Sequence, residues 1–171
     1  MTKLDLDFDT ADLDRLIAAT QMAGPIVAGE MRATMDASVD LAQQQVRGNT
    51  PTGATGNLLQ SIARDVFGTP LSLTGRVTTA AVYGEPVEFG RKPGSMPPVE
   101  QTGLELWVRR KLGVPPNEVE SVAYAIAISI KRKGTQGKFM FKKGFEASKP
   151  IIKKQWSDLP TRVVAKMEAK L

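Results

Sequence analysis

The chain contains no cysteine and no histidine among its 171 residues. Without cysteine, a disulfide framework and a zinc site built on thiolates are excluded. Without histidine, the chain lacks the side chain that most often serves as a general base or a metal ligand near neutral pH. Ser/His/Asp, Cys/His and histidine-based metal chemistry are therefore impossible. We expect a protein that is not an enzyme, with no catalytic residue, no metal ligand and no cofactor.

Long apolar runs are also missing. None approaches the roughly 18 to 20 residues needed to cross a bilayer, so no contact with a membrane is expected. The first ten residues, MTKLDLDFDT, lack the basic start and apolar core of a secretory signal, which predicts synthesis in the cytoplasm. The hydrophobic share of 42% and the charged share of 24% are typical of a globular protein. The length suits a single domain over residues 1–171.

The net charge of +5 is unevenly distributed along the chain. Residues 1–40 carry eight acidic and three basic side chains, whereas the remainder carries ten acidic and twenty basic ones. Residues 131–154 hold nine cations and a single acid, Glu146. Two oppositely charged regions suit head-to-tail packing of identical subunits. The simpler interpretation is an acidic helix and a basic face that are both solvated.

The first third of the chain predicts a long amphipathic helix. Residues 1–10 alternate leucine and aspartate too briefly to define an element, and we expect them to form an extended or mobile arm. Helical spacing begins at Asp12, breaks near Gly24–Pro25, and then continues at three- and four-residue intervals. Glycine supplies the stop near Arg47–Gly48.

A small antiparallel sheet is expected next. The loop NTPTGATGN (49–57) leads into a segment, 58–68, that begins as a short helix and continues as a strand. Residues 72–84 alternate well and predict a second strand that pairs with the first. Residues 86–89 are expected to form a third strand, placed at the sheet edge because Pro86 lacks a backbone donor.

The last part of the chain is predicted to be helical. Apolar spacing indicates one helix over 104–112, a second up to Lys133, with Asn117 and Glu120 as its capping box, and a long C-terminal one. Pro160 should kink the last helix or begin a new one. The fold class is therefore α+β, with a long N-terminal helix, a small antiparallel sheet and three further helices, including a long C-terminal one.

Two motifs suggest a small-ligand site, but neither matches the full pattern of a phosphate-binding loop or a calcium loop. GTQGKF (134–139) lacks the glycine spacing of a phosphate-binding loop and has Phe139 where that loop needs serine or threonine. The alternating acids Asp5, Asp7 and Asp9 lack the glycine turn and closing glutamate of a calcium loop. Neither motif supports a nucleotide or metal site.

The stretch EFGRKPGSMPP (88–98) packs two cations, two glycines and three prolines into eleven residues. Prolines stiffen such a loop, so that ordering it against a partner costs less entropy. We interpret it as the end of an edge strand followed by an assembly surface; the alternative is a solvated connector. The candidate interface residues are Glu88, Phe89, Gly90, Arg91, Lys92, Pro93 and Met96.

A second candidate surface is basic. Its cations alternate with Phe139, Phe141 and Phe145, a combination that can hold nucleic acid by phosphate contacts and base stacking. Against this, the aromatic residues lie where a core-facing cluster is expected, and cations at the end of a helix also suit its dipole. No sequence-specific recognition motif is present. The candidate contact residues are Lys131, Arg132, Lys133, Lys138, Lys142 and Lys143.

Several segments together resemble a known family. TPTGATGNLLQSI follows the long helix, AVYGEPVEFGRKPG follows the paired strands, and AIAISIKRKGTQG precedes MFKKGFEASKPIIKKQW. Over roughly residues 25–160 this order resembles the small tail-component family of long-tailed double-stranded DNA bacteriophages, the tail-completion or head–tail connector (neck) proteins. The proline-rich stretch 91–101 occurs in only some members.

The resemblance implies a structural virion protein made in the cytoplasm of the host bacterium. Such a subunit assembles into a ring, expected to be sixfold, around the DNA channel and joins head to tail. Its partners would be copies of itself and neighbouring neck and tail proteins: a connector or stopper, a tail terminator or the tail tube. Contact with DNA in the channel is a further expectation. The alternative is a non-specific DNA-binding protein that uses the basic 131–154 face.

Overall fold

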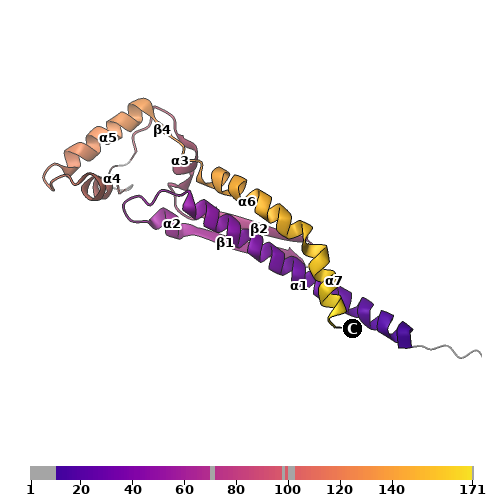
Figure 1. Cartoon of the computed structure of the whole chain (residues 1–171). Coiled ribbons are helices and arrows are strands. Elements are labelled where there is room, and N and C mark those ends of the chain that lie inside the picture. The colour runs from indigo at the N-terminus through magenta and orange to yellow at the C-terminus, as the bar shows by residue number, and fades with distance from the viewer. Residues whose placement is uncertain (1–10, 70–71, 98, 100–102, 171) are drawn as a thin grey trace, which may run out of the picture.

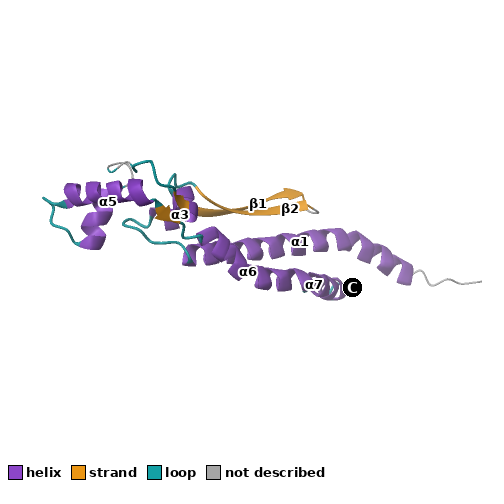
Figure 2. Cartoon of the chain, turned by 90° about the horizontal axis from the view of Figure 1, so that it is seen from above, coloured by secondary structure: helices purple, strands orange, loops and turns teal. Residues whose placement is uncertain are grey.

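The chain forms three layers, and one long helix is the middle layer. The computed structural model describes residues 11–69, 72–97, 99 and 103–170, and only the backbone of residues 11–20 and 22. The arm predicted over residues 1–10 lies outside this part. Helix α1 (Ala11–Gly48) runs along the molecule, with a hairpin on one side and helices α6 and α7 on the other (Figure 1, Figure 2).

Helix α1 is continuous, so the predicted break near Gly24–Pro25 is wrong. Pro25 lies inside the helix with its ring exposed. Proline removes one intrahelical hydrogen bond and crowds the preceding turn. The next residue, Ile26, is buried, so packing against the rest of the molecule resumes at once and the helix continues through the proline. The predicted end at Arg47–Gly48 is confirmed.

The hairpin agrees with the sequence. Helix α2 (Asn57–Ser61) leads directly into β1 (Ile62–Thr69), which pairs antiparallel with β2 (Ser72–Thr79). Gly75 of β2 lies so close to α1 that a Cβ there would collide with Val39 and Met35. Gln43 of α1 also donates to the carbonyl oxygen of Ile62 at 2.8 Å. One face of α1 therefore packs on the hairpin.

A group of short elements lies beyond the end of α1 (Figure 1). It comprises α3 (Gly84–Phe89), β3 (Gly90–Arg91), α4 (Leu104–Trp107), a π-helical turn η1 (Val108–Leu112), α5 (Val119–Lys133) and β4 (Thr135–Gln136). Gly113, in the left-handed conformation, ends η1 as predicted. The predicted capping box is wrong, because α5 begins after Glu118 without a side-chain cap.

The C-terminal helix is in two parts, as the position of Pro160 predicts. Helix α6 (Met140–Ser157) runs back along α1, and α7 (Leu159–Glu168) begins with Pro160 in its first turn. Helices α1 and α6 approach closely where Gly144 meets Val46. The predicted α+β architecture is confirmed. Among the residues described, no helix is long and apolar enough to cross a membrane.

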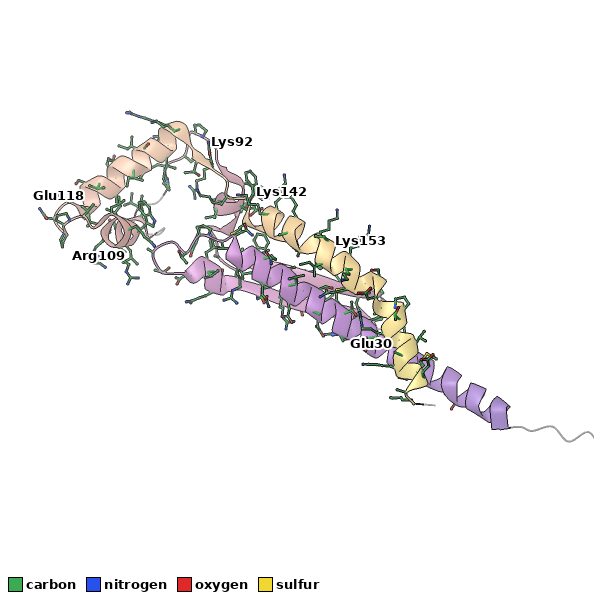
Figure 3. All side chains as sticks on the ribbon, in the orientation of Figure 1. Glu30, Lys92, Arg109, Glu118, Lys142 and Lys153 are labelled. Atoms are coloured by element: carbon green, nitrogen blue, oxygen red, sulfur yellow. The ribbon has the colours of Figure 1, made fainter. Side chains whose placement is uncertain are left out.

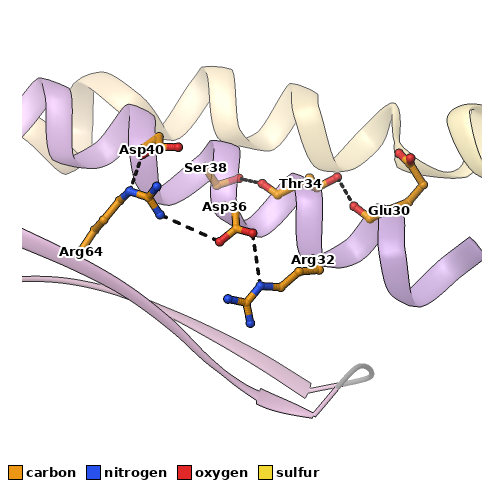
Figure 4. A network of polar contacts seen from close by, with 7 residues as sticks. All are labelled: Glu30, Arg32, Thr34, Asp36, Ser38, Asp40 and Arg64. Carbon is orange, nitrogen blue, oxygen red and sulfur yellow. Dashed lines mark hydrogen bonds and ion pairs between the residues drawn. The ribbon is translucent and has the colours of Figure 1, made fainter. Parts of the chain in front are cut away.

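A polar stripe on α1 faces α6 and α7. Glu30, Thr34 and Ser38 are all buried, and each hydroxyl donates to the carbonyl oxygen one turn earlier at 2.7 Å (Figure 4). Arg162 of α7 donates to the Glu30 carboxylate at 3.1 Å and to the Thr34 hydroxyl at 2.6 Å. Trp156 of α6 donates to the Ser38 hydroxyl at 3.1 Å. The helical layer is therefore fixed in register by hydrogen bonds as well as by apolar contact.

The opposite flank of α1 carries an exposed network of charges (Figure 4). Asp36 accepts from Arg32 at 3.2 Å, and Arg64 of β1 pairs with Asp40. These side chains remain more than a third exposed, so solvent screens the pairs and each contributes little to stability.

The buried Glu30 predicts an acid-sensitive contact. Hydrogen bonds from Lys166 and then Arg162 hold the pKa of the Glu30 carboxyl below its ordinary 4.5, although burial acts in the opposite direction. A carboxyl with a lowered folded-state pKa stabilises the fold above its unfolded pKa and loses that effect as the pH falls through the folded value. Replacing Glu30 by glutamine should therefore destabilise the protein near neutral pH.

That stability difference should shrink below about pH 4. Urea unfolding of the wild type and of Glu30→Gln over this range measures it. Asp36→Asn, on the exposed flank, is the matched control and should show a smaller difference. A Glu30→Gln difference that stays constant from neutral to acid pH would contradict the assignment.

Candidate assembly surface

The first predicted surface begins with a helix, not an edge strand. Residues 84–89 form α3, with Pro86 in its first turn, where a missing N–H leaves no bond unmade. The strand predicted at Pro86–Phe89 is therefore wrong; four residues are too few for periodicity to separate strand from helix. Extended backbone begins at Gly90 and pairs within the chain, β3 with β4. Residues 86–89 therefore offer no strand edge to which a neighbouring subunit could pair.

Glu88 is a structural residue and not a surface contact. Its side chain is only 6% exposed. Its carboxylate accepts from the backbone N–H groups of Phe141 at 2.9 Å and Lys142 at 3.2 Å. These are free donors in the first turn of α6, where a negative charge also suits the helix dipole. Glu88 thus caps a helix more than fifty residues later in the chain, and its assignment to the assembly interface is wrong.

Three glycines let two distant segments touch along their backbones. A Cβ at Gly90 would collide with the Thr135 carbonyl oxygen, one at Gly134 with that of Arg91, and one at Gly137 with that of Glu88. Gly90 and Gly134 also have φ values of 82° and 71°, which glycine adopts most readily. The segment 88–94 is therefore joined to 131–139.

The remaining predicted interface residues lie in or next to this junction and differ in exposure. Phe89 is 69% exposed, and Lys92 and Pro93 are exposed as well. Gly90, Arg91 and Met96 are half-buried. The exposed part of the predicted surface is therefore narrower than the sequence indicates.

The basic face lies against this same junction. Lys131, Arg132 and Lys133 form the last turn of α5, and Gly94 donates to the carbonyl oxygen of Lys131 at 2.8 Å. All six predicted basic residues are exposed: Lys131, Arg132, Lys133, Lys138, Lys142 and Lys143. The structure thus places the two predicted surfaces side by side, which their separation of about forty residues does not reveal.

More cations extend the face along α6. Lys149, Lys153 and Lys154 are exposed, and Lys142 and Lys153 project from the side of α6 away from α1 (Figure 3). Ion pairs among the described residues lie within α1 or join α1 to β1 and to α7, and none involves a cation of residues 131–154. This face therefore carries positive charge that the fold itself does not use.

A hollow with a mixed polar and apolar lining, which we call the aromatic groove, lies beside the basic face. It has a volume of about 500 Å³ and is lined by Thr79–Val82, Gly84, Glu85, Glu88, Phe89 and Phe141. The rings of Phe141 and Phe145 lie 6.4 Å apart. Two of the aromatic residues predicted to face the core, Phe139 and Phe145, are more than 40% exposed, whereas the neighbouring Met140 is fully buried. The core-facing prediction is therefore wrong for these two rings, because the first turn of α6 presents only one side to α1.

A second, larger hollow of about 640 Å³ lies between the loop 51–55, α3 and the helices α4 and α5. Tyr83, Val87 and Trp107 contribute to its wall. Arg110 of η1 donates to the carbonyl oxygen of Ala54 at 3.0 Å and so ties the distal helices to the loop. The hollow is lined mainly by apolar side chains and threonines, without a nucleophile–base pair.

Acidic side chains are not gathered into a metal site in the described part of the chain, where no group of three or more could hold an ion. The features at this end of the molecule are exposed apolar and basic side chains on a hydrogen-bonded backbone junction, which is the composition of a contact surface. No family model, no curated protein and no solved structure matches this chain.

Proposed function

We propose that this protein is a structural subunit of the neck of a tailed bacteriophage, a tail-completion or head–tail connector protein. It assembles into a sixfold ring around the DNA channel and is located in the virion. In this role it works by matching surfaces to its own copies and to neighbouring neck and tail proteins. It catalyses no reaction.

One observation carries the proposal: parts of the segments on which the family resemblance rests meet in space. Tyr83–Gly90 and the segment around Arg132–Phe141 are joined where Lys138 donates to the Val87 carbonyl oxygen at 2.8 Å and Phe139 to that of Glu88 at 3.1 Å. The loop 52–57 shares the larger hollow with Tyr83 and Val87. Segments that form one junction are expected to keep their sequence pattern together for the sake of the fold and its contacts.

Deleting the gene from the phage that carries it tests this role. The proposal predicts full heads and complete tails that fail to join, as seen by negative-stain electron microscopy. A copy of the gene supplied from a plasmid should restore infectious particles. Normal particles from the deletion phage would contradict the proposal.

Non-specific DNA binding is the second candidate, favoured by the cations of the basic face, which form no ion pair within the described part of the chain and lie beside the exposed rings of Phe139 and Phe145. It predicts binding to random duplex DNA that weakens steeply with salt, because phosphate contacts release counterions. Replacing Lys131, Arg132, Lys133, Lys142 and Lys143 by glutamine should then abolish retention on a DNA column.

The same five changes separate the two candidates. If the basic face serves assembly, the five-residue variant should differ from the wild type in oligomer size, measured on a sizing column with light-scattering detection. If the face binds DNA, the variant should lose retention on the DNA column and keep the oligomer size of the wild type. Replacing Lys111 of η1 and Lys170, which follows the end of α7, by glutamine is a control that removes exposed charge elsewhere. Unchanged size and unchanged DNA retention in the five-residue variant would remove both uses of this face.

A further inference from the structure

The aromatic groove exposes more apolar surface than the fold needs. Val82 is 95% exposed and Phe89 69%, and Phe145 beside Phe141 is 45% exposed. Apolar side chains gathered in this way around a hollow mark a binding site for another protein segment.

Charge around the groove defines what can bind there. The backbone N–H of Lys138 donates to the carbonyl oxygen of Val87, which places Lys138 beside α3. Lys142 lies in the first turn of α6, next to Phe141. Both lysines are exposed. Glu85 also lines the groove, and the Glu88 carboxylate is already occupied by backbone donors. A segment that combines apolar and acidic side chains would therefore complement the groove and the basic face together.

Residues 1–10 of this chain have that chemistry. Leu4, Leu6 and Phe8 alternate with three aspartates, at positions 5, 7 and 9. In an extended segment, alternate side chains point to opposite sides. A segment of this sequence can place its apolar side chains in the groove and its carboxylates toward lysines.

The length of α1 prevents a chain from filling its own groove. The groove lies at the end of α1 where Val46 contacts Gly144, and α1 begins at Ala11, at the opposite end of the molecule (Figure 1). At 1.5 Å per residue, Ala11 and Val46 are about 52 Å apart. Ten fully extended residues span at most about 36 Å. Only a second copy can supply the segment.

We propose that residues 1–10 of one copy bind in the aromatic groove of the next, with their aspartates facing its basic face. The contact deepens the ring assembly proposed above and rests on it. It joins two different surfaces of the same protein, so it is a head-to-tail contact that generates a closed ring or an open filament.

Cysteine cross-linking tests the contact in the full chain, which has no cysteine of its own. Two single variants, Phe8→Cys and Val82→Cys, are purified and mixed under mild oxidation. The proposal predicts a disulfide-linked product that contains one chain of each variant, identified by mass spectrometry. Phe8→Cys mixed with Tyr124→Cys, an exposed position on α5, should give no more of the mixed product than random collision does.

A double variant that carries both Phe8→Cys and Val82→Cys distinguishes a contact between two copies from a contact within one chain. The proposal predicts linked ladders or rings and no cross-link within one chain. A cross-link within one chain, or equal yields with Val82→Cys and Tyr124→Cys, would overturn the proposal.

An equilibrium measurement supplies a second readout. Phe89→Ser should weaken self-association in sedimentation equilibrium about tenfold or more, as expected when a buried phenylalanine side chain is lost from an interface. Tyr124→Ser should leave it unchanged, and an equal effect of both variants would count against the groove. If the protein is present in virions but these contacts fail, only this inference is wrong; if the contacts form but the virion lacks the protein, only the proposed function is wrong.

Discussion

Replacing Glu88 by alanine should lower the free energy of unfolding by about 2–3 kcal/mol. The change removes both charge-assisted hydrogen bonds to the first turn of α6 and leaves the N–H groups of Phe141 and Lys142 without their partner. It also removes the negative charge that faces the helix dipole. Urea unfolding followed by circular dichroism measures the effect.

Glu85→Ala is the matched control for this prediction. Glu85 lies on the same short helix, is exposed, and forms no ion pair among the contacts described. Its replacement should change the free energy of unfolding by less than about 0.5 kcal/mol. Equal effects of Glu85→Ala and Glu88→Ala would contradict the capping role and return Glu88 to the list of surface contacts.

Replacing Gly144 by alanine should destabilise the protein by about 2 kcal/mol or more. An added Cβ would lie 2.6 Å from Cγ2 of Val46 and 2.7 Å from its Cα and N. Two of these atoms belong to the backbone of α1, so the two helices must move apart, which is the cost of overpacking. A thermal or urea unfolding curve of Gly144→Ala measures this cost.

Gly29→Ala makes the same chemical change with the opposite expected sign. Gly29 lies within α1, and nothing stands within 4 Å of where its Cβ would be. Alanine at an open helical position should stabilise the fold by about 0.5–1 kcal/mol. If both variants shift stability in the same direction, close contact between α1 and α6 at Gly144 is not what determines the effect.

The sequence predicts those parts of the fold in which one face is apolar and repeats regularly. Alternation over 72–84 predicts β2, and apolar spacing up to Lys133 predicts α5. The polar stripe of Glu30, Thr34 and Ser38 could not be recognised in this way, because buried polar residues look like a solvated face until their partners on α7 are known. Pro25 is a related case: the sequence shows a residue that disfavours a helix interior, but not that Ile26, directly after it, is buried and that the helix continues.

The candidate surface depends even more on contacts between distant residues. The sequence identifies Phe89, Lys92 and the cations of 131–143 as unusual, but not that β3 and β4 place them together. It assigns Glu88 to the interface because Glu88 begins the stretch EFGRKPGSMPP (88–98). Its role is set by Phe141 and Lys142, more than fifty residues away. Long-range caps of this kind leave no local pattern.

These corrections make the assembly surface more specific. It consists of the exposed side chains of the junction, Phe89, Lys92 and Pro93, with the aromatic groove on one side and the cations of α5 and α6 on the other. The buried residues at its base, Glu88 and the three glycines, fix the shape on which those side chains are displayed. Variants of the base should therefore alter stability, and variants of the rim should alter association.

Quantitative mass spectrometry of purified virions tests the proposed function most directly. The account predicts that peptides of this protein are present at the abundance of one ring, equal to other sixfold neck components and far below the tail-tube protein. The comparison needs only peptides of known sequence from each protein as internal standards. Virions that are infectious yet contain no copy of this protein would contradict the account.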